Sequence, residues 1–145
     1  MKKHALSTVC MVSLLALLAA VSAYAYVSST VIAKVPFSFS VGNESLPAGH
    51  YTLYQSSEGY VSLLGPQGSA FLGWTLPGRT VRPDGEPKIV FHRYGDQYFL
   101  SEIFSGTDNV SRKLPVSKLE KEHRASSPAV AENRQERDVV IFGTR

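Results

Sequence analysis

Short runs of β-branched and aromatic residues, broken by Gly, Pro, Asn and Asp, recur along residues 27–104. In "VPFSFSVG", Phe37, Phe39 and Val41 alternate with serines, which predicts a strand with one apolar and one polar face. "VSSTVIAKV" predicts a preceding strand, and Pro36 separates the two because proline lacks the N–H that a sheet ladder needs. This spacing of short strands and turn residues is typical of an all-β domain.

A second group of strands surrounds a glycine-rich turn. "HYTLYQ" carries Tyr51 and Leu53 on one face, and "YVSLL" and "SAFLGWTL" flank the sequence "GPQG" at 65–68. Proline at the second turn position and glycine at the fourth predict a tight hairpin. A phosphate-binding loop would need a lysine and a helix directly after the glycines, and neither follows. We therefore interpret 65–68 as a turn.

The stretch "IVFHRYGDQYFLSEIF" at 89–104 predicts another hairpin, with Gly95 and Asp96 as its two-residue turn. In this register His92 faces Phe99, and Ile89 faces Glu102. Alternation then divides the side chains between two faces. One face receives Ile89, Phe91, Arg93, Tyr98, Leu100 and Glu102; the other receives Val90, His92, Phe99, Ser101 and Ile103. A one-residue bulge would reverse this parity.

The same hairpin raises an enzymatic alternative. A small secreted hydrolase could use His92 and Ser101 with an acid from a loop, either Asp84 or Asp108. The regular register weakens this hypothesis, because Glu102 falls on the face opposite His92 and no G-x-S-x-G elbow exposes Ser101. The hypothesis requires His92 and Ser101 to lie in an open cleft within hydrogen-bond reach of each other.

The chain beyond residue 104 predicts a short helix and a tail. In "SKLEKEHR", Ser117 and Glu120 have the capping-box spacing of a helix start, and Leu119 is expected to face inward. Residues 125–145 are interpreted as a disordered tail with a possible terminal strand, "DVVIFG", at 138–143. Four consecutive apolar residues are costly to leave in water. This strand is expected to dock on an edge of its own sheet, with self-association through a neighbour's edge as the alternative.

Residues 1–25, "MKKHALSTVCMVSLLALLAAVSAYA", have the layout of a secretory signal peptide. Two lysines precede an apolar run, and small residues allow cleavage after Ala25 or Ala23. The run is shorter than the roughly 20 residues that a transmembrane helix needs. The protein is therefore expected to be exported, to the periplasm or the outside, with membrane contact only through the leader. Residues 26–124 would form the β domain with its C-terminal helix.

Composition then removes several classes of chemistry from the exported chain. Cys10 is the single cysteine and lies in the leader, which excludes disulfides, cysteine nucleophiles and thiolate metal sites after cleavage. The histidines show no metal-ligand spacing, so we expect neither metal nor cofactor. Loss of the two leader lysines lowers the formal net charge from +3 to +1. This charge does not indicate nucleic-acid binding.

Four segments resemble those of a family of small exported bacterial proteins of unknown function, of acidobacterial type. They are V-P-F-x-F and L-P-A-G-x-Y in "KVPFSFSVGNESLPAGHYTL", F-x-R-Y-G-D-x-Y-F-L in "IVFHRYGDQYFLSEIF", and a charged helix after L-P. The resemblance covers about residues 33–124. It implies the β architecture and export, and it brings no activity, cofactor or catalytic residue with it.

These patterns together predict a small antiparallel β-sandwich, or a partly open barrel, of about seven strands, with a short C-terminal helix and a flexible tail. The expected core combines the apolar positions of the predicted strands. It comprises Phe37, Phe39, Val41, Tyr51, Leu53, Val61, Leu63, Phe71, Phe91, Leu100 and Ile103.

For function, the sequence favours a non-enzymatic exported module that binds a partner or has a structural role in the envelope. Exposed aromatic residues, namely Tyr54, Tyr60 and Trp74, are the candidates for contact with an unknown envelope protein or glycan. For Trp74 itself, core packing is the favoured role. In the loop "PGRTVRPDGEPK", Arg79 and Arg82 could bind a carboxylate or phosphate, since the guanidinium group pairs with both.

Overall fold

The computed structural model describes residues 29–56, 58–82, 85–126 and 138–145. The predicted signal peptide lies outside these ranges, as does Asp84. The described residues form two β-sheets and one short helix, α2 (Lys118–Ser126). An all-β sandwich-like fold with a C-terminal helix is thereby confirmed, and the two sheets do not close into a barrel.

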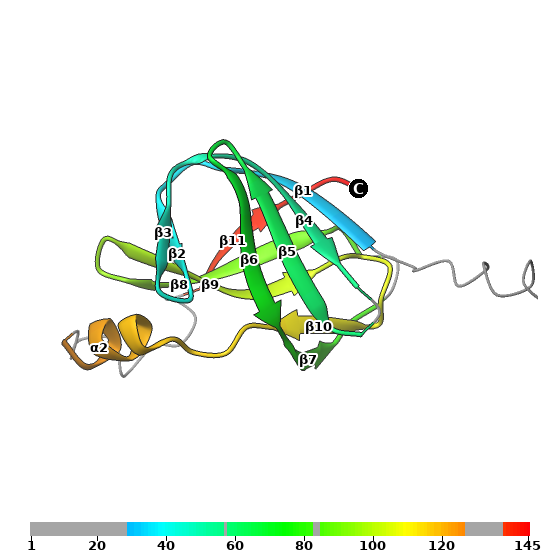
Figure 1. The fold of residues 1–145 in the computed structure, drawn as a ribbon. Coiled ribbons are helices and arrows are strands. Elements are labelled where there is room, and N and C mark those ends of the chain that lie inside the picture. Colours follow the sequence, from blue (N-terminus) through cyan, green and yellow to red (C-terminus); the bar gives the residue numbers. More distant parts are fainter. Residues whose placement is uncertain (1–28, 57, 83–84, 127–137) are drawn as a thin grey trace, which may run out of the picture.

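The first sheet is antiparallel and has the order β1 (Ser29–Val35), β4 (Gly49–Gln55), β5 (Tyr60–Gly65) and β6 (Gly68–Trp74). The second has the order β11 (Asp138–Phe142), β8 (Lys88–Tyr94), β9 (Gln97–Phe104), β10 (Val110–Lys113) and β7 (Leu76–Thr80). A hairpin of β2 (Phe39–Val41) and β3 (Glu44–Leu46) joins β9 through a parallel bridge between Ser40 and Phe99. Helix α2 lies at the end of the molecule where this hairpin and the β8–β9 turn are found (Figure 1).

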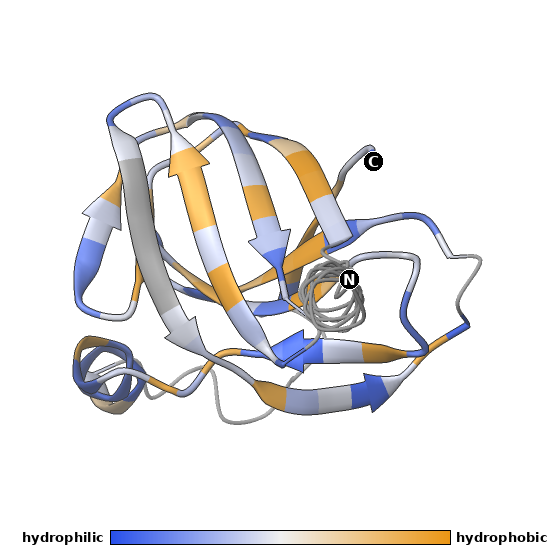
Figure 2. Cartoon of the chain, turned by 45° about the vertical axis from the view of Figure 1, so that its right-hand side comes forward, coloured by the Kyte–Doolittle hydropathy of each residue, from blue (hydrophilic) through white to orange (hydrophobic). Residues whose placement is uncertain are grey.

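The core lies between the two sheets, and hydrophobic residues alternate with polar ones along the strands that enclose it (Figure 2). Nine predicted core residues are buried there: Phe39, Val41, Tyr51, Leu53, Val61, Leu63, Phe91, Leu100 and Ile103. Phe37 is only half-buried against this cluster, and the side chain of Phe71 lies outside the described part. The prediction omitted Val31, Ala33 and Val35 of β1, together with Leu46, Ile89 and Leu114.

The β2 strand departs from the expected alternation of buried and exposed residues. Its middle residue, Ser40, is buried like Phe39 and Val41. The strand lies between β3 and β9, so both of its edges are covered.

The β8–β9 hairpin has the predicted turn but not the predicted register throughout. Near Gly95 the pairs are as expected, with His92 opposite Phe99. Beyond Phe91 the register shifts by one, so Glu102 faces Val90, and Ile89 faces Ile103. The predicted pairing of Ile89 with Glu102 is therefore wrong.

The physical reason is a β-bulge at Ser101, which has no partner residue on β8. The bulge reverses the parity of the residues after it. Ile103 enters the core, and Glu102 moves to the outer face that Val90 and His92 share. The predicted assignment of Glu102 to the face of Phe91, and of Ile103 to the face of His92, is corrected accordingly.

Besides the chain crossings from β1 to β2 and from β3 to β4, the two sheets are connected at two corners. At one corner, Thr75 alone separates β6 from β7, and its backbone N–H donates to the carbonyl of Gly59 at 2.9 Å. At the other corner, Ile32 of β1 and Thr144 exchange two backbone hydrogen bonds of 2.8 Å each. The end of the chain thus bridges the edge of the first sheet to the second sheet.

The predicted terminal strand is confirmed as β11, which pairs with β8 from Asp138 to Phe142. Its docking is within the chain, which was the favoured route. Val139 and Ile141 pack against the core, while Val140 and Phe142 face outward. Association between molecules through this segment stays a prediction. Residues 127–137, part of the predicted disordered tail, lie outside the described residues.

Helix α2 confirms the predicted helix and extends it by two residues. The Ser117 side chain caps it, since the Glu120 backbone N–H donates to Ser117 Oγ at 3.1 Å. The buried residue of the helix is Glu120, however, and Leu119 is only half-buried. A carboxylate, rather than the expected leucine, is the side chain that this polar helix buries.

Neighbouring positions of β11 provide a matched test of its docking. Ile141→Ala is expected to lower the free energy of unfolding by about 1–3 kcal/mol, because Ile141 packs against the core. Val140→Ala, one residue away on the outer face, should change it by less than about 0.5 kcal/mol. Urea unfolding of both variants measures the difference. Equal effects would show that β11 does not dock in this orientation.

Candidate functional site

The three predicted surface aromatics lie on one face, the outer side of the first sheet. Tyr54 is on β4, Tyr60 on β5 and Trp74 on β6. Tyr60 pairs directly with Trp74, and Tyr54 pairs with Ser62, which is two residues from Tyr60 on the same face. The rings therefore form a diagonal row across three adjacent strands, which we call the aromatic row.

Exposure of the aromatic row is high for such large side chains. Trp74 is 63% exposed and Tyr54 is 42% exposed, while Tyr60 is half-buried. Core packing as the role of Trp74 is therefore wrong. The Trp74 and Tyr60 rings meet edge to face, with their centroids 5.4 Å apart. This contact orients the indole ring without removing it from solvent.

Small polar residues and aliphatic ones surround the aromatic row. Thr52 and Ser62 occupy the same face as Tyr54 on β4 and β5, and both are half-buried. Ile32 and Leu64 extend this face on either side of Thr52 and are each more than a third exposed. The face thus presents rings and methyl groups with hydroxyl groups between them.

The two predicted arginines lie on a different part of the molecule from the aromatic row. Arg79 belongs to β7 of the second sheet, and its guanidinium Nη2 donates to Glu102 Oε2 at 2.8 Å. Arg82 follows β7 and is exposed. The structure therefore divides the predicted surface into an aromatic part on the first sheet and a cationic part on the second.

Glu102 is buried in a hydrogen-bond network on the outer face of the second sheet. Besides Arg79, the Ser111 hydroxyl donates to Glu102 Oε1, and the Arg79 backbone N–H donates to the same oxygen at 3.3 Å. Burial by itself raises the pKa of Glu102, but these hydrogen bonds and the charge of Arg79 together hold that pKa below its usual value. The hydrogen bond to Glu102 raises the pKa of Arg79.

Gly78 has no side chain, and this leaves room for the hydrogen-bond network around Glu102. A Cβ atom at position 78 would meet Ser111 Oγ, and it would lie 2.6 Å from Glu102 Oε1. The close approach of the β7 backbone to the carboxylate thus requires glycine. The network directs the Arg79 guanidinium toward Glu102, while the Arg79 side chain stays 66% exposed.

His92 has a carboxylate partner that sequence reasoning missed. His92 Nδ1 lies 2.6 Å from Glu120 Oε1, and the Tyr94 hydroxyl donates to the same oxygen at 3.3 Å. Glu120 is only 4% exposed. His92 Nε2 lies 3.9 Å from Asp138 Oδ1 of β11. The cluster attaches both α2 and β11 to β8.

The geometry required for a hydrolase is not present among the described residues. Ser101 is buried, and its hydroxyl donates to the Val90 carbonyl at 3.1 Å instead of approaching His92. Asp108 accepts a hydrogen bond from the side-chain amide of Gln55 at 2.7 Å. Asp84 lies outside the residues that the structure describes. Among the described residues, His92 thus has an orienting carboxylate, while the Ser101 hydroxyl is directed away from it.

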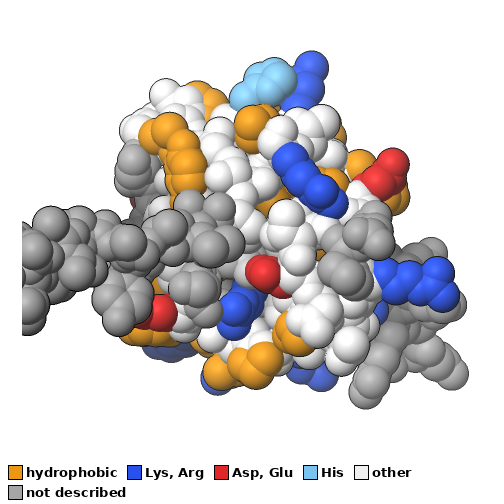
Figure 3. Space-filling view, turned by 90° about the vertical axis from the view of Figure 1, so that its right-hand side faces the viewer, with side chains coloured by type: hydrophobic (Ala, Val, Ile, Leu, Met, Phe, Trp, Pro, Cys, Tyr) orange, Lys and Arg blue, Asp and Glu red, His pale blue; other side chains and the backbone are white. Residues whose placement is uncertain are grey.

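Neither a three-residue metal-ligand cluster nor a membrane-spanning helix is found among the described residues. No three His, Cys, Asp or Glu residues in it are grouped closely enough to hold a metal ion. Within the same ranges, no helix combines the length and apolar character needed to cross a membrane. On the side shown in Figure 3, Lys and Arg side chains are dispersed among hydrophobic and polar ones rather than gathered in a basic stripe.

Acidification tests the Glu102 network. The pKa of Glu102 in the folded state lies below its unfolded value of about 4.3. The stabilisation that Glu102 gives the folded state is therefore present above that pH and is lost as the pH falls through the folded pKa. Glu102→Gln is expected to lower the free energy of unfolding by about 1–2 kcal/mol at neutral pH, and by less in acid.

Urea titrations at neutral pH and at about pH 3 measure this difference. Glu44→Gln, at an exposed position of β3, is the control and should show no such dependence. A penalty for Glu102→Gln that stays constant or grows in acid would contradict the network described here.

Comparisons of this chain with protein-family models, with curated proteins and with solved structures found no match. The resemblance to small exported bacterial proteins therefore stays a prediction from the sequence. What the structure adds is a sandwich-like fold with an exposed aromatic row on one sheet and a buried carboxylate network on the other.

Proposed function

We propose that this protein is a non-enzymatic binding module, exported to the periplasm or the outside, that contacts a glycan of the envelope through the aromatic row. The exposure of Trp74, at 63%, is the observation that carries the proposal. An indole ring exposed beside other exposed rings is apolar surface of the kind that a binding partner covers. The leader sequence supports export, and the buried Ser101 hydroxyl supports a role other than hydrolysis.

A glycan suits this face better than a protein does. Pyranose rings present flat C–H faces that pack on aromatic rings, with hydroxyl groups around their edges. The aromatic row offers rings in line, and Thr52 and Ser62 place hydroxyl groups between them. A stable protein interface needs a larger continuous apolar area, about 800 Å² on each partner. A single row of rings divided by polar side chains therefore favours a glycan, which is narrower than a protein surface.

The rigidity of the row also supports binding. Its residues lie on β4, β5 and β6, strands that are hydrogen-bonded to one another, so the spacing of the rings is set by the sheet. Tyr and Trp have few rotatable bonds, so ordering them on a ligand costs little conformational entropy. Trp74 is further held by its edge contact with Tyr60.

Trp74 is the single tryptophan of the chain, so its fluorescence reports directly on the proposed site. Emission of the free protein should be that of a solvated indole. Titration with soluble oligosaccharides released from the envelope is expected to shift the emission to shorter wavelength in a saturable manner. Tyr54→Ala should weaken the affinity by about tenfold while retaining the signal.

Trp74→Ala is tested by retention on immobilised envelope polysaccharide, since it lacks the fluorophore. The control is Leu76→Ala, which removes another exposed apolar side chain, on β7 of the second sheet, and should leave retention unchanged. Equal retention of wild type and of a variant with alanine at all three aromatic positions would exclude the glycan role. Retention of that triple variant on envelope proteins alone would point to a protein partner at another surface.

A further inference from the structure

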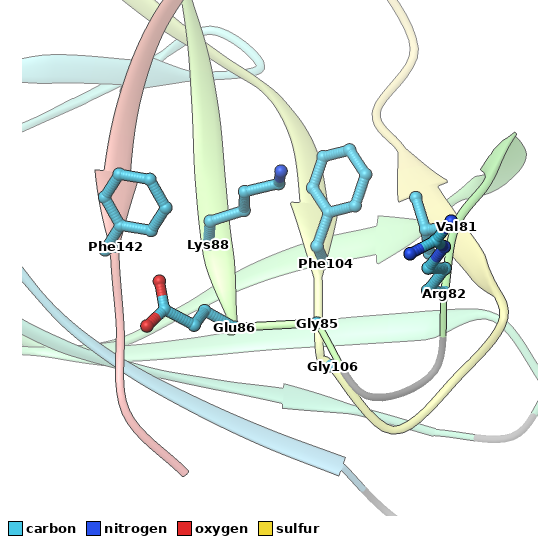
Figure 4. Close-up of a pocket in the computed structure, with 8 residues that line it drawn as sticks. All are labelled: Val81, Arg82, Gly85, Glu86, Lys88, Phe104, Gly106 and Phe142. Atoms are coloured by element: carbon cyan, nitrogen blue, oxygen red, sulfur yellow. The ribbon is translucent and has the colours of Figure 1, made fainter.

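A cavity of about 340 Å³ lies over the outer face of the second sheet, away from the aromatic row. Its walls come from β11, β8 and β9, and from the segments that follow β7 and β9. The lining residues are Val81, Arg82, Gly85, Glu86, Lys88, Phe104, Gly106 and Phe142 (Figure 4). A volume of this size is at the lower end of the range for small-molecule sites.

Three of these residues form a row set by strand register. Phe142 pairs with Lys88, and Lys88 pairs with Phe104, so their side chains leave neighbouring strands at the same level. Figure 4 shows the lysine between the two phenyl rings. Its ammonium Nζ is 4.8 Å from the centre of the Phe104 ring. The cavity thus presents aromatic surface on both sides of a cation.

Among the described residues that line the cavity, cationic side chains outnumber anionic ones. Lys88 and Arg82 are cationic and Glu86 is anionic, and none of the three forms an ion pair with a described residue. The nearby Arg79 is paired with Glu102. In Figure 4, Phe104 lies between Lys88 on one side and Arg82 on the other. The Phe104 ring itself contacts two cations, Lys88 and Arg79, whose guanidinium carbon lies 5.7 Å from the ring centre.

The C-terminal residue fixes the loops at the rim. Arg145 Nη2 donates to the carbonyl of Gly106 at 2.7 Å and to that of Gly85 at 3.3 Å. Gly106 has a φ of 74°, and a Cβ there would meet the Gly85 carbonyl oxygen. The two loops therefore approach closely, and the guanidinium of Arg145 holds their carbonyl groups together. This contact preforms the cavity.

We propose that this cavity binds a small apolar carboxylate, either an aryl acid or a short acyl acid. The carboxylate lies between Lys88 and Arg82, and the apolar body lies along the rings of Phe104 and Phe142. A carboxylate can accept charge-assisted hydrogen bonds from both the ammonium group and the guanidinium group. The site is independent of the aromatic row and of the glycan proposal.

Calorimetric titration of the mature protein with naphthoate and with octanoate tests the site. Comparison of the two affinities distinguishes an aryl acid from an acyl acid as the ligand. Naphthamide, which has the same ring system and no charge, should bind at least about tenfold more weakly than naphthoate. Lys88→Gln should weaken carboxylate binding by about tenfold for the same reason. Lys34→Gln removes an exposed lysine of β1 on the other sheet and should have no effect.

Phe142→Ala provides a second variant that keeps the fold, since this side chain is 63% exposed on an edge strand. It should weaken binding of the apolar body while the unfolding midpoint stays within the range of the Lys34→Gln control. Failure of both carboxylates to bind the wild type would overturn the proposal. So would equal binding of naphthoate and naphthamide, or equal affinity of the wild type and Lys88→Gln. None of these results bears on the fluorescence of Trp74.

Discussion

One extra residue in β9 determines the chemistry of the second sheet. Without the bulge at Ser101, strict alternation would put Glu102 in the core and Ile103 on the outer face. Burying that carboxylate among apolar side chains would cost several kcal/mol. The bulge instead directs Glu102 toward Arg79 and Ser111. The Ser101 carbonyl accepts the N–H of Leu114 at 2.8 Å, which continues the β9–β10 pairing toward the chain that leads to α2.

The same change of parity brings β9 and the C-terminus into one site. Phe104 points outward because it follows the bulge, and it meets Lys88 across the strand pair. β11 then adds Phe142 beside Lys88. The residues after β11 hold the surroundings in place, through the Thr144 bridge to β1 and the Arg145 contacts with the loops. Residues from distant parts of the chain thus become neighbours through backbone pairing. The first sheet keeps the aromatic row separate from them, so the molecule has two faces with different chemistry.

The sequence was sufficient where a feature is local. Apolar alternation found Phe39, Tyr51 and Leu53 in the core, and the Gly95 turn placed the β8–β9 hairpin. It failed where the outcome depends on contacts distant in the chain. Whether a strand contains a bulge depends on which side chains each face of the sheet can bury. Alternation alone therefore did not place the bulge at Ser101. The Glu120 partner of His92 is 28 residues away, and its capping spacing revealed only a helix start. Likewise, hydrophobicity alone assigns Trp74 to a core as readily as to a surface.

Contacts across β8 and β9 in solution test the bulge most directly. Nuclear Overhauser effects between backbone protons identify facing residues, because paired strands bring them within about 5 Å. The structure predicts cross-peaks that pair Val90 with Glu102 and Ile89 with Ile103. Cross-peaks pairing Ile89 with Glu102 instead would show an unbroken register. That result would place Phe104 and Glu102 on the core side of the sheet and contradict both the Glu102 network and the cationic cavity.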